Sequence, residues 1–172
     1  MVQPTQHDIA PELTPEAWKA LPVHERALRR AAYWTDVRKV EEQPRGSNKG
    51  PEVSYFLEAA GAHPGDPWCV SFVAANFKDS GGTELPPNPA STHSWYEWAH
   101  QTGRLVTTPR RGDVFIIIES PTTGHGGHVI EMTGNSYRTL EGNTNDGQSR
   151  EGYGCFRHTR TANASTHFIR MS

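Results

Sequence analysis

The pattern of apolar and polar positions divides the chain into a helical first half and a strand-rich second half. Between His24 and Val40, apolar and aromatic side chains recur at helical spacing. Residues 1–13 lack such a pattern and are predicted to form a loose N-terminal arm. Start and stop signals such as Thr14, Gly61 and Gly103 delimit further helices. These are expected at residues 15–21, 52–61, 67–82 and 91–103.

The second half carries short runs of β-branched and apolar residues that predict strands. The clearest is "GDVFIIIE" (112–119), and Gly134-Asn135 is a turn signal between two others. The remaining strands are expected at residues 128–134, 136–143, 155–160 and 167–171. Because the helices come first and the strands follow with short connections, the order predicts an α+β fold with an antiparallel sheet.

Composition and charge narrow the class of protein. The chain has 172 residues, of which 34% are hydrophobic and 21% charged, which suits a single globular domain. The formal net charge of −2 and the lack of a basic run argue against nucleic-acid binding. The longest very apolar run, "VFIII" (114–118), is too short to span a membrane. No basic segment followed by an apolar one marks the N-terminus as a signal peptide.

Cys69 is the first candidate for chemistry, because it lies at the start of a predicted helix. A helix N-terminus presents unpaired N–H groups and the positive end of the helix dipole, which favour an anion such as a thiolate. The alternative is a small buried hydrophobe in a core helix. The chain's other cysteine is Cys155, and without a secretory signal both are expected to be free thiols.

A nucleophilic cysteine needs a base, and His128 is the predicted one among nine histidines. It opens a predicted strand and follows Gly126 and Gly127, which are expected to leave space for a substrate backbone. His125, three residues earlier, is interpreted as a loop residue. The alternative for His128 itself is a structural role.

Glu141 and Asn143 are the candidates for a third group that orients the imidazole. They lie two apart, so on a strand they point to the same face. A hairpin closed by Gly134-Asn135 would bring one of them beside His128. The alternatives are an exposed strand carboxylate for Glu141 and a turn-forming residue for Asn143.

Four segments in order resemble the CHAP family, the cysteine- and histidine-dependent amidohydrolases/peptidases of the papain-like clan. They are "GDPWCVSFV", "RRGDVFII", "GHGGHVIEM" and "LEGNTN". The resemblance implies a papain-like CHAP fold over residues 36–172, with residues 1–35 packed on it as an arm and helices.

The resemblance also implies roles for individual residues. Cys69 would be the nucleophile, His128 the general base, Glu141 the group that orients it, and Asn143 a further polar partner. Asp66 is expected to cap the helix of Cys69 or to position substrate. Gly112-Asp113 is interpreted as a structural turn into the first strand.

No metal or cofactor is expected. Some members of the family bind calcium through aspartates before the nucleophile, but this chain has no Asp-x-Asp there. The cysteines and histidines also lack the spacing of a strong zinc site.

The function implied by the resemblance is cleavage of an amide bond in bacterial peptidoglycan. Both an N-acetylmuramoyl-L-alanine amidase and a stem or bridge endopeptidase fit. The expected setting is a phage or prophage endolysin, made in the cytoplasm and released to the wall, or a secreted bacteriolytic effector. Two alternatives stay open: a thiol acyl-hydrolase or transferase on a non-wall substrate, and an inactive peptidoglycan-binding module. The sequence leaves the oligomeric state open.

Overall fold

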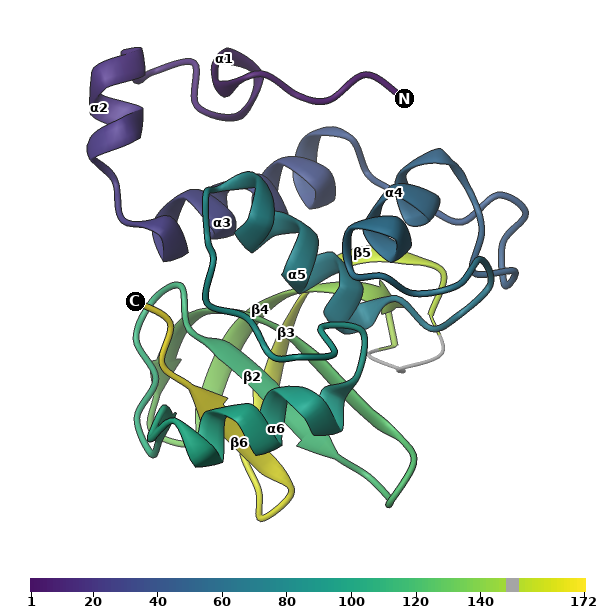
Figure 1. Ribbon diagram of the computed structural model, residues 1–172, viewed down its shortest axis with the longest axis vertical. Helices are drawn as coiled ribbons and strands as arrows, with labels where there is room; N and C mark the ends of the chain where they lie inside the picture. The colour runs from purple at the N-terminus through teal and green to yellow at the C-terminus, as the bar shows by residue number, and fades with distance from the viewer. Residues whose placement is uncertain (148–151) are drawn as a thin grey trace.

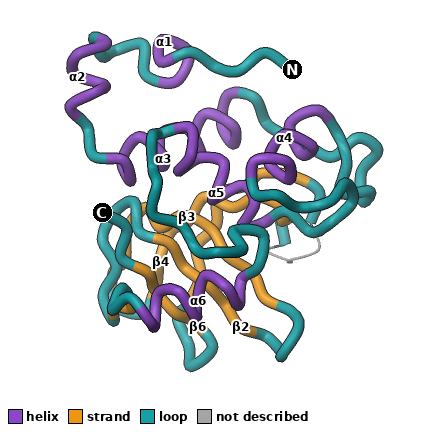
Figure 2. Tube along the Cα trace, viewed as in Figure 1, coloured by secondary structure: helices purple, strands orange, loops and turns teal. Residues whose placement is uncertain are grey.

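A computed structural model describes residues 1–147 and 152–172, and it shows helices stacked on one face of a β-sheet (Figure 1). The helices come from the first part of the chain and the strands from the second (Figure 2). The α+β fold predicted from the element order is therefore confirmed.

The helices follow the predicted order with small differences in their bounds. They are α1 (Gln6–Ile9), α2 (Pro15–Ala20), α3 (Val23–Ala32), the π-helix η1 (Tyr33–Val37), α4 (Pro51–Ala59), α5 (Cys69–Asp79) and α6 (Thr92–Gln101). The predicted arm contains a short helix that was missed, α1, which Thr5 and Asp8 cap reciprocally. The long helix predicted to Val40 changes to a π-helix after Ala32.

The described strands form one antiparallel sheet. They are β1 (Leu105–Val106), β2 (Val114–Ile118), β3 (Gly124–Thr133), β4 (Ser136–Thr144), β5 (Gly154–Thr161) and β6 (Thr166–Ile169). Their order across the sheet is β1-β6-β2-β3-β4-β5. Strand β1 was not predicted, because two residues are too short to give a pattern. Strand β3 begins four residues earlier than predicted, so the "GHGG" segment is strand and not loop.

The two faces of the sheet differ in what they contact. Val114 and Ile116 pack with α5 and α6 in one buried core. The opposite face carries Phe115 and Tyr137, which pack with each other in a second apolar cluster. Consecutive strand residues thus serve two cores, as the alternation of side chains requires. Within the described part of the chain, no helix is both long and apolar enough to cross a membrane.

Candidate active site

Cys69 is the first residue of α5, a helix whose residues are buried from Cys69 through Phe77. Trp68 is the N-cap residue, and no side chain caps the helix. The unpaired N–H groups of its first turn are therefore not occupied by a capping side chain. Cys69 is 5% exposed, and this small exposure opens into a groove.

The Cys69 groove has a volume of about 370 Å³ and is formed by three segments around the head of α5. These segments are residues 61–69, 88–93 and 122–124, each contributing part of the lining. The lining residues are mostly small or polar, with four hydroxyl side chains and one side-chain amide, and Asp66 and two histidines add ionisable groups to that of Cys69. Such a lining suits a polar substrate that presents hydrogen-bonding groups.

Asn143 holds the backbone directly before Cys69. With its amide oxygen facing Trp68, it accepts a hydrogen bond of 3.1 Å from the Trp68 backbone N–H. The Trp68 indole donates a second bond, of 2.9 Å, to Glu42. Gly142 permits this approach, since a Cβ there would lie 2.7 Å from the Trp68 ring. Asn143 therefore stabilises the backbone next to Cys69. It does not bind His128, contrary to the expectation from the sequence.

Glu141 contacts a histidine, but the histidine is His125 and not the predicted His128. The Nε2 atom of His125 lies 2.6 Å from a Glu141 carboxylate oxygen, and both side chains are almost completely buried. The predicted pairing of Glu141 with His128 is therefore wrong, and so is the interpretation of His125 as a loop residue.

The reason is a β-bulge in the β3–β4 hairpin. Around the turn, Thr133 pairs with Ser136, but the register shifts by one residue between Val129 and Glu131. His128 consequently pairs with Leu140 instead of Glu141. A shift of one residue exchanges the faces, so Glu141 shares its face with the residue three positions before His128.

His128 lies on the helix-covered face and is packed among residues of α5. Its ring stacks on Phe77, meets Phe72 edge-on, and places Nε2 3.3 Å from the Asn76 amide nitrogen. His128 is completely buried, and burial lowers the pKa of its imidazole to about 3. It is a neutral core residue, which is the structural alternative considered for it.

Gly126 and Gly127, which lie between the two histidines, allow close packing on opposite faces of the sheet. A Cβ at Gly126 would lie 2.9 Å from Val70 of α5, so its absence lets the head of the helix approach the strand. A Cβ at Gly127 would lie 2.9 Å from Cγ of Glu141. The space that was predicted for a substrate backbone is thus filled by the protein's own side chains.

Electrostatics distinguish His125 sharply from His128. Burial opposes a charge on His125, but interactions with Cys69 and Glu141 outweigh it and raise the pKa of the imidazole to about 9. Burial also opposes the charge on Glu141, while Arg160 and His125 together lower the pKa of this carboxyl to about 2. His125 and Glu141 are therefore an imidazolium–carboxylate pair near neutral pH.

The ring nitrogen of His125 that remains for Cys69 is Nδ1, since Nε2 is bound to Glu141. Nδ1 is buried and makes no hydrogen bond of standard geometry to any described residue. The Cys69 side chain nonetheless interacts with His125 and favours the charged imidazole, which raises its pKa. Catalytic hydrogen bonds that are long in a free enzyme commonly tighten when substrate binds.

Two further expectations concern residues flanking the site. Asp66 does not cap α5. Its carboxylate accepts a hydrogen bond of 2.9 Å from the His63 backbone N–H, and the residue does line the Cys69 groove.

Asp113 has the structural role expected of it: it is buried and accepts hydrogen bonds from the Arg110 and Met171 backbone N–H groups. Cys155 is buried and not bonded to Cys69.

Sequence reasoning missed Arg160 and Thr139, which also bind the Glu141 carboxylate. Arg160 donates two hydrogen bonds to the carboxylate, and the Thr139 hydroxyl donates one of 2.5 Å. The parity of positions 139 and 141 along β4 was an available signal for Thr139. No local pattern points to Arg160, because it reaches Glu141 from β5.

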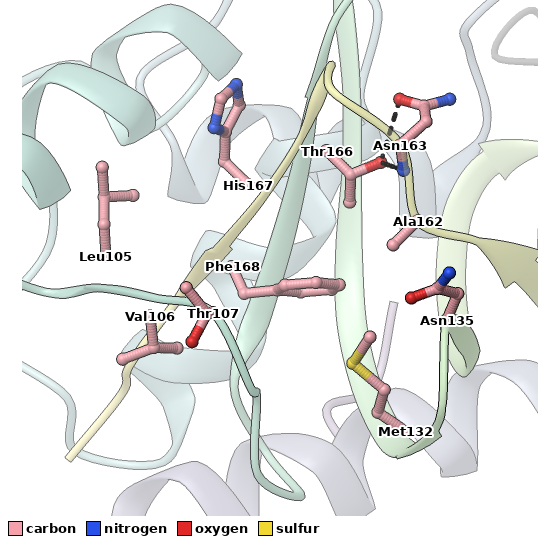
Figure 3. Close-up of a pocket in the computed structure, with 10 residues that line it drawn as sticks. All are labelled: Leu105, Val106, Thr107, Met132, Asn135, Ala162, Asn163, Thr166, His167 and Phe168. Atoms are coloured by element: carbon pink, nitrogen blue, oxygen red, sulfur yellow. Dashed lines mark hydrogen bonds between the residues drawn. The ribbon is translucent and has the colours of Figure 1, made fainter.

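A roomier hollow, of about 490 Å³, lies away from Cys69 and is lined by residues of β1, the β3–β4 turn and the β5–β6 segment. Figure 3 shows Phe168 and Met132 in it, with Asn163 hydrogen-bonded to Thr166 at its rim. Its lining contains no cysteine and no carboxylate. Chemistry, and not volume, therefore identifies the Cys69 groove as the candidate active site.

Among residues 1–147 and 152–172, no group of three or more metal-ligating side chains is placed to hold an ion. No family model matches the chain, and no curated protein or solved structure shows significant similarity to it. Any proposal of function therefore rests on the site and on the sequence motifs that supply its residues.

Proposed function

We propose that this protein is a cysteine-dependent hydrolase that cleaves an amide bond in bacterial peptidoglycan. The observation that carries the proposal is the arrangement of Cys69 at the head of a buried helix, facing a groove, with the His125–Glu141 pair behind it. The four segments that resemble the CHAP family support the choice of peptidoglycan. Here the role of the base passes from His128 to His125.

In the proposed reaction, the proton of Cys69 resides on His125, and the sulfur attacks the carbonyl carbon of the amide as a thiolate. The carbonyl oxygen becomes an oxyanion beside the uncapped first turn of α5, where N–H groups can stabilise it. His125 then gives its proton to the departing amine, which leaves an acyl-enzyme. A water molecule that loses its proton to His125 releases the acid product and restores Cys69.

Glu141 supports this cycle from the far side of the ring. It binds Nε2 of His125 and thereby leaves Nδ1 for the sulfur. A carboxylate at this position also stabilises the imidazolium that gives its proton to the amine in the first half of the reaction and forms again in the second. Asn143 contributes indirectly, because it fixes the backbone of Trp68 next to the nucleophile.

The direct test is digestion of purified peptidoglycan, followed by mass spectrometry of the soluble fragments. Release of fragments with a new amine and a new carboxyl identifies the bond and separates an amidase from an endopeptidase. The matched control is Cys69→Ala, which should lose activity by at least about 10³-fold with an unchanged melting temperature. Wall binding without turnover by the wild type, or hydrolysis of small thioesters alone, would contradict the proposal.

A further inference from the structure

Glu141 is held by Arg160 as firmly as by His125. The Arg160 guanidinium donates bonds of 2.7 and 2.6 Å to the two carboxylate oxygens. Its side chain is 13% exposed and that of Glu141 is 0% exposed. A two-point bond of this kind fixes both the plane of the carboxylate and its distance from its neighbours.

The charge on Glu141 matters because the charge on His125 changes twice in each turnover. When His125 is protonated, the carboxylate has an adjacent cation. When His125 has given its proton away, a carboxylate without Arg160 would be a buried anion next to a neutral ring. Such an isolated buried charge is costly, and the group avoids it by binding a proton itself.

We propose that Arg160 is a positioning residue that keeps Glu141 ionised and oriented while His125 gains and loses its proton. The inference rests on the proposed function, since it assumes that His125 cycles between its two charge states. It adds a residue on β5 to a site whose other members lie on α5, β3 and β4. Arg160 is not one of the described residues that line the Cys69 groove.

Several other charged or titratable groups act on this cluster and define the background of a pH experiment. Tyr137 of β4 and His158 of β5 interact electrostatically with Glu141, and Glu119 interacts with Arg160. Cys69 of α5 acts on His125. Substitution of Arg160 leaves all of these groups in place, so the change in pH response reports the loss of the guanidinium.

The experiment compares the wild type with Arg160→Met and Arg160→Lys across pH 4 to 10. The first readout is the rate of Cys69 alkylation by iodoacetamide, which requires no substrate. The second is kcat/KM for peptidoglycan hydrolysis. Removal of a buried cation favours protonation of its neighbours, so both limbs of the activity profile and the acid limb of alkylation should move to higher pH. We expect shifts of about one pH unit or more for Arg160→Met, and smaller shifts for Arg160→Lys.

A uniform loss of rate with unshifted limbs would mean that Arg160 is only structural and would overturn the inference. If Arg160→Met does not fold, Arg160→Lys decides alone: a shift of the same sign supports the proposal and an unshifted profile overturns it. The two readouts also separate this inference from the function. A shifted alkylation profile in a protein that cleaves no peptidoglycan would keep the role of Arg160 and reject the substrate.

Discussion

His125 and His128 lie three residues apart on one strand, are both buried, and have opposite electrostatic properties. His125 faces Glu141 and has a pKa raised to about 9, whereas His128 faces α5 and has a pKa lowered to about 3. The difference arises from what each face of the sheet presents. Burial alone excludes the charge from His128, and an ionised partner restores it to His125.

Substitution of each histidine by glutamine should separate the two roles, and this is the largest expected effect. His125→Gln removes the proposed base, so peptidoglycan hydrolysis should fall by about 10²–10⁴-fold while the fold persists. His128→Gln should retain most of the activity per folded molecule but lose about 1–3 kcal/mol of stability, because it disrupts the packing against Phe72 and Phe77. Equal losses of activity in two folded variants would contradict the distinction between a catalytic His125 and a structural His128.

Gly127→Ala should damage the His125 face specifically. The new Cβ would lie within 3 Å of Glu141 and Phe115, so these side chains must shift from their present positions beside His125. We expect about 1–3 kcal/mol of destabilisation by overpacking and roughly a 10²-fold loss of activity from misplacement of the pair. Chemical denaturation and kcat/KM measure the two effects. A stable variant with wild-type kcat/KM would show that Glu141 does not need its present position.

The two histidines should also affect stability in different pH windows. For His128 the folded pKa is depressed, so the unfolded chain binds more protons and stability falls as the pH drops from about 6.5 toward 3. For His125 the folded pKa is raised, so its contribution is present below about 6.5 and is lost as the pH rises toward 9. Urea unfolding of His128→Gln should show a weaker loss on the acid side only. An unchanged acid slope would contradict the assignment of His128 as a neutral core residue.

Cys155→Ser should have the smallest effect and provides the contrast to Cys69. Cys155 is buried, and burial raises the pKa of its thiol. It lines a different hollow, beside η1. Activity should stay within about twofold of the wild type, with a modest loss of stability from the new hydroxyl. A large loss of kcat/KM without unfolding would assign Cys155 a role in the reaction.

The sequence predicted the fold class and the position of Cys69 because both depend on local patterns. Apolar periodicity marked α5, and the Pro-Trp-Cys segment marked its beginning. The choice of histidine depended instead on whether one residue of β3 bulges out of register. The residues at positions 129–131 give no sequence signal that predicts the bulge. In a regular hairpin, His128 would have paired with Glu141.

The contribution of Arg160 could not be predicted from the sequence for a related reason. Its contact with Glu141 depends on the pairing of β5 with β4 and on the reach of a long side chain along the two strands. Asn143 was recognised as a site residue, but its partner was not, because Trp68 comes from a segment 75 positions earlier. Local sequence identified several members of the site, while tertiary pairing decided which of them touch.

An NMR titration of the histidine rings in the wild type and in Cys69→Ala tests most directly whether His125 is the partner of Cys69. His125 should titrate near pH 9, and its pKa should fall in Cys69→Ala, because the interaction with the sulfur is lost. His128 should show no titration above about pH 4 in either protein. A His128 resonance that titrates near neutral pH and responds to Cys69→Ala, with His125 unaffected, would contradict the central claim that His125 is the partner of Cys69.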